Sequence, residues 1–198
     1  MSKIKILNST SGYNLAACDY DKKEKYLNSF EQNKLLPLFG IVRDKKILEV
    51  GAGTGRLALA LFNEGAQVTA LDVSFEMLKI LADKNKKIEI VVGEAENLPF
   101  KDGGFDFVTA AFLVVHLKNP LLFFDESYRV LKDDGKIIIT NINQKDAPEV
   151  KTKQGKIKIE SFYHHPEKII EVLESLAFKI EKNIFVCHIY FSFISGIS

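Results

Sequence analysis

The chain has 198 residues and a formal net charge of +1, with 46% hydrophobic and 27% charged residues. These values are typical of one soluble globular domain, and the balanced charge gives no support for a polyanion-binding surface spread over the whole protein. No apolar run approaches the ~20 residues of a membrane-spanning helix, no signal-peptide pattern opens the chain, and Cys18 and Cys187 lack the spacing of a zinc site. We therefore expect a cytoplasmic protein without a resident metal ion.

The first part of the chain is expected to form a helical extension, residues 1–40, ahead of a main domain formed by residues 41–198. Apolar residues at i, i+3 and i+4 spacing predict a helix in two pieces over residues 13–39. Gly40 is placed to end this helix.

Beyond residue 40, short apolar runs alternate with amphipathic segments. The runs predict five strands, over residues 46–50, 67–71, 88–92, 105–110 and 136–141. The amphipathic segments predict helices over residues 56–64, 74–82 and 120–131. Ser74 is a good N-cap for the second of these helices, and Pro120 suits the first turn of the third.

The C-terminal third begins with a turn at 133–135, and residues 143–162 are polar and give no clear prediction. A helix is predicted over residues 166–176, followed by closing strands over 178–185 and 188–193. The strand–helix alternation favours a mostly parallel sheet covered on both faces. The closing strands are joined by too few residues for a parallel crossover, so they should be antiparallel to each other.

Three glycines between the first strand and the following helix, Gly51, Gly53 and Gly55, are the strongest functional signal. Glycine allows a tight turn and a close backbone approach to a ligand, and the helix start offers free N–H groups. A dinucleotide site expects G-x-G-x-x-G, but Arg56 stands where the third glycine should be. A different nucleotide-type ligand is therefore favoured over a dinucleotide, and the bland alternative is a glycine-rich turn without a ligand.

Asp72 ends the second predicted strand, 19 residues after Gly53. Strand ends converge on one crevice in an open α/β sheet, so this carboxylate is placed to accept hydrogen bonds from the two hydroxyls of a ribose. The alternative is that Asp72 merely caps the helix that follows.

Four stretches carry a resemblance to a known family: LEVGAGTGRLA at 48–58, ALDVSFEML at 70–78, VVGEAENLPFKDGGFDFVTAAFLVVHL at 91–117 and YRVLKDDGKIII at 128–139. The chain resembles a class I S-adenosylmethionine-dependent methyltransferase of the Methyltransferase-11 type, similar to the quinone-biosynthesis methyltransferases. The resemblance implies a Rossmann-like, seven-stranded, mostly parallel sheet in the order 3-2-1-4-5-7-6, with strand 7 antiparallel. It also implies helices on both faces and an N-terminal helical lid.

The resemblance further implies S-adenosylmethionine as cofactor, with S-adenosylhomocysteine as product. The cofactor-binding residues it indicates are Tyr13, Glu49, Gly51, Ala52, Gly53, Asp72, Val73, Met77, Glu94, Ala95, Ala111 and Phe112.

The resemblance gives some of these residues particular roles. Asp72 would hold the ribose, Glu49 would orient the amino-acid part, and Ala111 and Phe112 would face the methyl group. Val73 and Met77 would pack on the adenine, although Met77 is also at core spacing. Glu94 stands where the family usually has Asp to accept from the adenine amine. Tyr13 would cover the cofactor as part of the lid, a role for which Tyr20 and Tyr26 compete.

His116 lies where the family often has histidine, and an imidazole with a pKa near 6.5 is a candidate general base. The alternative is a histidine that lines the pocket or bonds to the backbone. His164 and His165 are adjacent and point to opposite sides, so they are poorly placed to share a metal. The lysines between residues 151 and 158 are best interpreted as a solvated edge strand.

The predicted function is methyl transfer to a small-molecule acceptor by in-line displacement, with catalysis mainly by positioning. The residues Ala110-Ala111-Phe112-Leu113 differ from the Asn/Asp-Pro-Pro-Tyr/Phe motif of amino-methylating DNA and glutamine enzymes. Three alternatives stay open: a protein or RNA methyltransferase with a partner subunit, a non-catalytic cofactor-binding module, and a nucleotide-dependent oxidoreductase. We expect no nucleic-acid partner, no membrane span, and a monomer or homodimer.

Overall fold

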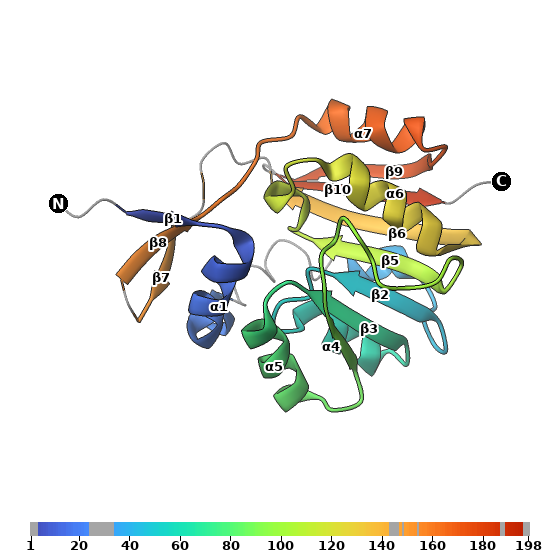
Figure 1. Cartoon of the computed structure of the whole chain (residues 1–198). Coiled ribbons are helices and arrows are strands. Elements are labelled where there is room, and N and C mark those ends of the chain that lie inside the picture. The colour runs from blue at the N-terminus through green and yellow to red at the C-terminus, as the bar shows by residue number, and fades with distance from the viewer. Residues whose placement is uncertain are drawn as a thin grey trace.

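A central sheet of seven strands organises the molecule, in the spatial order β4-β3-β2-β5-β6-β10-β9 (Figure 1). The computed structural model describes residues 4–23, 34–142, 147, 149–153, 155–186 and 189–195. The strands are β2 (Lys46–Val50), β3 (Gln67–Asp72), β4 (Glu89–Val92), β5 (Phe105–Ala111), β6 (Leu131–Ile142), β9 (Lys179–Val186) and β10 (Ile189–Ser195). Each begins and ends within a few residues of its predicted bounds, except β6.

The first five of these strands run parallel to one another, and β10 lies antiparallel to both β6 and β9. The α/β fold with a mostly parallel sheet is therefore confirmed. The antiparallel pairing of β9 and β10 confirms the prediction for the two closing strands. In a parallel arrangement the carboxyl ends of β2 to β6 lie along one edge of the sheet, which is where ligands bind in open α/β folds.

Helices cover both faces of the sheet (Figure 1). They are α3 (Leu36–Phe39), α4 (Arg56–Asn63), α5 (Phe75–Lys84), α6 (Pro120–Val130) and α7 (Pro166–Ser175). The side chain of Ser74 accepts a hydrogen bond from the Met77 N–H and so caps α5, as predicted. Pro120 occupies the first turn of α6, also as predicted, with Asn119 as its cap.

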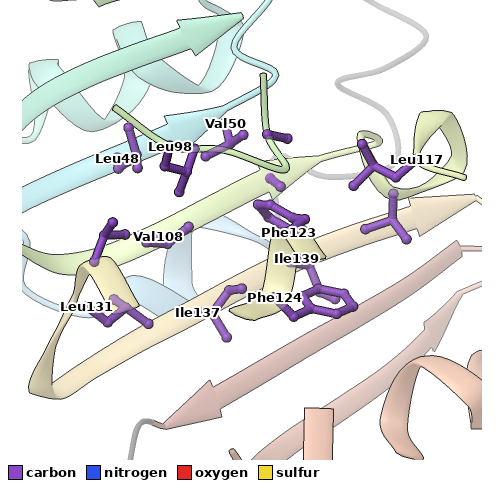
Figure 2. Close-up of a cluster of buried hydrophobic side chains, with 14 of the residues drawn as sticks. Leu48, Val50, Leu98, Val108, Leu117, Phe123, Phe124, Leu131, Ile137 and Ile139 are labelled. Carbon is purple, nitrogen blue, oxygen red and sulfur yellow. The ribbon is translucent and has the colours of Figure 1, made fainter. Parts of the chain in front are cut away.

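One hydrophobic cluster lies between the helices and the sheet on each face, because the residues of a strand point alternately to the two faces of the sheet. Ile137 and Ile139 lie in the cluster that packs under α6 and α7, whereas Ile138 lies in the cluster on the opposite face. Phe123 and Phe124 of α6 are both fully buried against the first cluster (Figure 2). This packing fixes the strands, and with them the loops at their carboxyl ends.

The start of β6 differs from the prediction. A helix to about residue 131, a turn and a strand from residue 136 were expected, but Leu131 already pairs with Phe105 on β5. The next paired residue of β6 is Lys136, opposite Phe107, so residues 132–135 leave the ladder as an excursion. A Cβ at Gly135 would lie 2.8 Å from the Lys132 carbonyl oxygen, which is why the predicted turn needs a glycine there.

A second, smaller sheet lies beside the central one and joins the N-terminal strand to the segment of residues 149–159 (Figure 1). It has the order β1-β8-β7, built from β1 (Lys5–Leu7), β8 (Gly155–Ile159) and β7 (Glu149–Thr152). Strand β1 is parallel to β8, and β7 is antiparallel to it. The sequence predicted an edge strand among the lysines between residues 151 and 158, but it predicted neither β1 nor the pairing of these three strands into a separate sheet. Strand β7 carries an exposed Lys151 at the sheet edge, in agreement with the solvated strand expected there.

Helix α1 (Ser9–Tyr20) packs on this small sheet, and a single 3-10 turn (Asp21–Lys23) follows it. Ala16 contacts Val150, Ile157 and Ile159 in a third hydrophobic cluster. The helix begins at Ser9 rather than at residue 13, because the Asn8 side chain accepts from the Ser11 N–H and caps it there. Residues 24–33 of the predicted second piece, and with them Tyr26, lie outside the described residues, as does Cys187.

The predicted extension of residues 1–40 thus contains two environments. Leu35 and Phe39 are buried in the cluster of the central sheet, together with residues of α4 and α5. Helix α1, in contrast, shares its apolar contacts with β7 and β8. Within the part of the chain that the structure describes, no helix has the length and apolar character needed to cross a membrane.

Candidate functional site

The glycine loop between β2 and α4 is held against the end of β3 by its own backbone. Gly51 (φ 73°) and Gly53 (φ 55°) adopt left-handed conformations that other residues enter only with strain. The N–H groups of Gly51 and Ala52 both donate to the Leu71 carbonyl oxygen, at 2.8 and 3.0 Å. The loop therefore sits directly beside the carboxyl end of β3.

Asp72 joins this loop to the start of α5. Its Oδ2 accepts from the Gly53 N–H at 2.8 Å, and its Oδ1 accepts from the Ser74 N–H at 2.8 Å. The residue is 8% exposed, and this burial raises the pKa of its carboxyl group against the opposing effect of the backbone hydrogen bonds. Each carboxylate oxygen keeps a further lone pair, so two hydroxyl donors can still be accepted.

The end of β4 supplies the next wall of the site. Gly93 N–H donates to the Asp72 carbonyl oxygen at 3.1 Å, which places Glu94 just beyond Asp72. The Glu94 side chain is exposed, whereas Ala95 is buried. An exposed carboxylate at this point is available to accept a hydrogen bond from a ligand.

The loop that follows Glu94 is fixed by Arg129 of α6. Its guanidinium donates to the carbonyl oxygens of Leu98, at 3.0 Å, and Phe100, at 2.7 Å. The same guanidinium bonds to both carboxylate oxygens of Glu126, and Glu126 Oε2 also accepts from the Leu98 N–H at 2.7 Å. The backbone of this loop is thereby bonded to side chains of α6.

The residues after β5 divide between the site and the core. Leu113 lies over the glycine loop, with its Cδ1 3.0 Å from where a Gly51 Cβ would stand. Phe112 has a left-handed φ of 60°, which is unusual for a bulky residue and frequent at functional sites. Its ring packs with the cluster of the α4 face, 6.0 Å from the Arg56 guanidinium carbon. Of the predicted pair, Ala111 ends the strand at the site, and the ring of Phe112 points toward α4.

Helix α1 lies across the carboxyl edge and bonds to each part of it. Asn14 Oδ1 accepts from the Ser74 hydroxyl at 2.7 Å, beside Asp72. Asp21 accepts from the Thr54 hydroxyl at 2.6 Å and forms an ion pair with Lys84 at 2.8 Å. These bonds connect the N-terminal segment to the glycine loop and to both ends of α5.

Tyr13 and Tyr20 of α1 face the same space. The Tyr20 ring edge lies 3.9 Å from the position of a Gly53 Cβ, and the two tyrosine rings meet edge to face at 5.9 Å. Burial raises the pKa of Tyr13 well above its ordinary value, with smaller contributions from Tyr20 and Asp72. Both predicted lid tyrosines that the structure describes therefore lie over the loop.

His116, in the 3-10 turn Val114–His116, meets Tyr13 directly. Its Nε2 lies 2.7 Å from the Tyr13 hydroxyl, and its Nδ1 lies 3.0 Å from the Glu160 carbonyl oxygen. Burial lowers the pKa of His116, and the hydrogen bond to Glu160 opposes this shift. The histidine is thus held between the N-terminal helix and the chain that follows β8.

The remaining predicted cofactor residues are buried or partly buried. Glu49 is 2% exposed within β2, beside Thr109 of β5, and Met77 is 1% exposed under Ser74. Val73 is partly exposed between Asp72 and Ser74. His164 bonds to the Leu117 carbonyl oxygen at 2.8 Å. Across the described ranges, no group of three or more His, Cys, Asp or Glu residues is arranged to hold a metal ion.

Four residues at the site were not singled out by the sequence: Asn14, Asp21, Leu113 and Glu160. Asn14 directly follows Tyr13, and Asp21 directly follows Tyr20. Once the tyrosines were assigned to the lid, these polar neighbours could have been proposed as lid residues too. Leu113 follows a predicted site residue directly. Glu160 contributes a backbone carbonyl, which leaves no trace in the side-chain sequence.

Comparison with known proteins identifies the fold and the family. A model of the family described as "Methyltransferase domain" matches residues 48–139. An uncharacterized protein of Methanocaldococcus jannaschii is 34% identical over 171 residues, which is 81% of this chain and 80% of that protein. The crystal structure of a SAM-dependent methyltransferase from Aquifex aeolicus has the same fold, with a TM-score of 0.72 and 22% identity over 96% of this chain and 100% of that one.

The chain belongs to the class I S-adenosylmethionine-dependent methyltransferases. S-adenosylmethionine is the cofactor of this family, and its members are enzymes. A demethylmenaquinone methyltransferase of Thermotoga maritima is 34% identical over 134 residues, which is 67% of this chain and 56% of that enzyme. The chain spans about half the length of the curated demethylmenaquinone methyltransferases it matches, between 41% and 58% of each.

Proposed function

We propose that the protein transfers a methyl group from S-adenosylmethionine to a small-molecule acceptor. The observation that carries the proposal is the bond between Asp72 and Gly53, which ties a buried carboxylate to the glycine loop under helix α1. Backbone N–H groups bond to both of its oxygens, which holds the carboxylate in place, and the lone pairs that remain can accept further donors. Ribose hydroxyls are donors of the right chemistry, and the family supplies a cofactor that carries them.

The side chains around Asp72 fit the other parts of that cofactor. Glu94 is exposed beyond the end of β4 and would accept from the adenine amine, despite being one methylene longer than the usual Asp. Val73 and Met77 would border the adenine, and Ala95 would meet it through its backbone N–H. Glu49, buried at the end of β2, would orient the amino-acid part. When bound, the cofactor supplies a methyl group already activated for displacement.

The chain's own contribution is to position the acceptor and to exclude water. We propose that the lid consists of residues 4–23 together with the β7–β8 hairpin, because these segments share one hydrophobic cluster. Residues 34–39 of the predicted extension belong to the main domain by the same criterion, since Leu35 and Phe39 are buried there. The lid reaches the site through Tyr13, Asn14 and Asp21.

The acceptor that we propose is a small aromatic molecule of the quinone type. Support comes from the relatives named demethylmenaquinone methyltransferases, which are 35% identical over 104 residues and 34% identical over 134 residues. The lid is short, which suits a small acceptor rather than a folded macromolecule. We propose that the protein acts without a nucleic-acid partner, as a monomer or homodimer.

Calorimetric titration with S-adenosylhomocysteine tests the cofactor assignment. We expect micromolar binding to the natural protein, no binding of NAD, and a loss of at least about 100-fold in affinity for Asp72→Ala, equivalent to about 2.7 kcal/mol. Asp125→Ala, at an exposed position of α6, is the matched control and should bind normally. Binding of NAD in preference to S-adenosylhomocysteine would refute the proposal.

The acceptor is tested with methyl-labelled S-adenosylmethionine and a panel of small hydroquinones, phenols, amines and thiols. Label should pass to one or more hydroquinones or phenols. Transfer only to a protein or an RNA, with all small molecules inert, would favour the alternative of a macromolecular acceptor.

A further inference from the structure

The hydrogen bonds around His116 determine which of its ring nitrogens carries a proton. A backbone carbonyl can only accept, so the contact between Nδ1 and the Glu160 carbonyl oxygen requires a hydrogen on Nδ1. In the neutral ring Nε2 then holds a lone pair and can only accept. The Tyr13 hydroxyl, 2.7 Å from Nε2, must therefore donate to it.

Both groups are neutral in this arrangement, and their surroundings keep them so. Burial raises the pKa of Tyr13 and lowers the pKa of His116, which disfavours the phenolate and the imidazolium alike. The groups facing this pair are Tyr20 from the same helix, Asp72 from the end of β3, and the Glu160 carbonyl oxygen from the segment after β8. An acidic neighbour such as Asp72 opposes ionisation of Tyr13 and favours a positive charge on His116.

The Tyr13 oxygen can accept hydrogen bonds as well as donate one. Its hydrogen is directed to His116, so its lone pairs are left to accept a hydrogen bond from another molecule. Both rings keep part of their surface exposed, so a ligand can reach them. The rest of helix α1 holds Tyr13 in this place, through the bonds of Asn14 to Ser74 and of Asp21 to Thr54.

We propose that Tyr13 and His116 form a proton relay that takes the proton from an acidic hydroxyl of the methyl acceptor. Tyr13 is the catalytic residue of the pair because it would touch the acceptor, and His116 is the positioning residue that receives the proton behind it. The inference rests on the proposed function and deepens it by naming the acceptor class: molecules with a phenol, enol or hydroquinone hydroxyl.

The proton and the electrons balance in this step. As the acceptor forms its bond to the methyl carbon, the electron pair of the breaking sulfur–carbon bond returns to sulfur. The acceptor's hydroxyl proton passes to the Tyr13 oxygen, and the Tyr13 proton passes to Nε2 of His116. The positive charge that leaves sulfur thus ends on the imidazolium, where the Glu160 carbonyl oxygen accepts from Nδ1–H.

The relay is assembled from three separate segments of the chain. Tyr13 and His116 are 103 positions apart, and His116 and Glu160 are 44 positions apart. The Phe162 N–H donates to the Val115 carbonyl oxygen at 2.7 Å, which fixes the segment after β8 against the turn that carries His116. The proton acceptor is therefore complete only when the lid lies over the site.

Nitrogen NMR of the histidine rings tests the geometry without any acceptor. In the natural protein with S-adenosylhomocysteine, His116 should carry its proton on Nδ1 and show a hydrogen-bonded, unprotonated Nε2. In Tyr13→Phe the Nε2 signal should move toward that of a free ring nitrogen, while Nδ1 stays protonated. A proton on Nε2 in the natural protein would overturn the proposal, because that nitrogen then has no place for the Tyr13 proton.

Kinetics with an acceptor from the panel test the role. Tyr13→Phe should lower kcat by about 100-fold or more, the range of general acid–base catalysis, and leave the affinity for S-adenosylhomocysteine within about threefold. The natural enzyme should lose activity as the pH falls through the pKa of His116, because the imidazolium cannot accept a proton. That acidic limb should be absent from the residual activity of Tyr13→Phe and of His116→Gln.

Matched controls are Tyr128→Phe, whose ring packs on Phe178 in the core, and His165→Gln at an exposed position. Both should keep the natural kcat and pH profile. If Tyr13→Phe loses cofactor affinity and kcat in parallel with an unchanged pH profile, the pair is only a latch and the relay is refuted. Failure of the natural protein to bind S-adenosylhomocysteine would instead refute the proposed function, and the NMR result would still report the Tyr13 bond.

Discussion

The cofactor side and the lid side of the site are built in different ways. On the cofactor side, the decisive bond joins Asp72 to Gly53, 19 positions apart, and both lie at the ends of neighbouring parallel strands. On the lid side, the decisive bond joins Tyr13 to His116, 103 positions apart, and its second anchor is a backbone carbonyl. The first side is fixed by the core of the central sheet, and the second depends on a small sheet that pairs the N-terminal strand β1 with β8 and β7.

This difference indicates which part of the site can be substituted without a large loss of global stability. The cofactor loop shares its support with the main core, since Ala52 and Leu81 belong to the same cluster. The lid has its own small cluster around Ala16 and Ile159. Changes in the lid should therefore alter turnover or affinity and leave global stability nearly unchanged.

Two glycine substitutions, one in the core and one in the lid, should differ most in their effect on the free energy of unfolding. A Cβ at Gly55 would lie 2.1 Å from Leu81 Cδ1, which is fully buried, at a left-handed φ of 87°. We expect Gly55→Ala to lower the free energy of unfolding by about 3 kcal/mol, from overpacking and backbone strain together. A Cβ at Gly12 would lie 2.8 Å from Ile159, within the lid. Gly12→Ala should change global stability by less than about 1 kcal/mol, because the clash loosens the packing of α1 on its own small cluster, and the higher helix propensity of alanine offsets only part of it.

Urea unfolding measures the global free energy of unfolding, and hydrogen exchange of the α1 amides measures opening of the lid. Gly12→Ala should accelerate exchange in α1 alone. Equal losses of global stability in the two variants would contradict the separation of lid and core.

Much of the cofactor side could be predicted from the sequence because its signals are local. Ser74 after an apolar strand marks a helix cap, and the glycines at 51 and 53 mark the turns that the structure shows. Asp72 could be placed because parallel strand ends share one edge. The left-handed backbone of Phe112, whose ring lies 6.0 Å from the guanidinium carbon of Arg56 at the start of α4, has no signal in the sequence.

The resemblance implied an N-terminal helical lid, but the small sheet on which its helix packs could not be predicted, because the signals for that sheet are not local. Strand β1 has three residues, and its partner β8 lies about 150 positions later in the chain. Such short strands show little alternation, and pairing at this separation leaves no pattern in either segment. The contact of His116 with Glu160 uses a carbonyl oxygen that every residue possesses.

Arg129 offers a smaller test, on the loop that follows Glu94. Its bidentate contact with Glu126 and its bonds to two loop carbonyls need a planar guanidinium. Arg129→Lys keeps the charge but loses that fork, so the loop after Glu94 should loosen. We expect about a fivefold loss of S-adenosylhomocysteine affinity, in line with about 1 kcal/mol for a lost hydrogen bond. Arg43→Lys, at an exposed position, is the control, and an unchanged affinity in Arg129→Lys would show that the loop does not border the cofactor.

The ion pair of Asp21 with Lys84 should give the smallest effect, because the carboxylate is substantially exposed and such pairs contribute little. Burial opposes ionisation, but hydrogen bonds from Lys84 and Thr54 outweigh it and lower the pKa of Asp21. Because the folded pKa is lowered, the stabilisation is present above the ordinary pKa near 4 and is lost as the pH falls through the folded value. Because Asp21 joins the N-terminal segment to the glycine loop and to α5, Asp21→Asn should weaken S-adenosylhomocysteine binding by about twofold at pH 7 and low salt, with no difference from the natural protein at high salt. Titration at two salt concentrations measures this effect, and a loss that persists at high salt would assign it to the Thr54 hydrogen bond rather than to the charge.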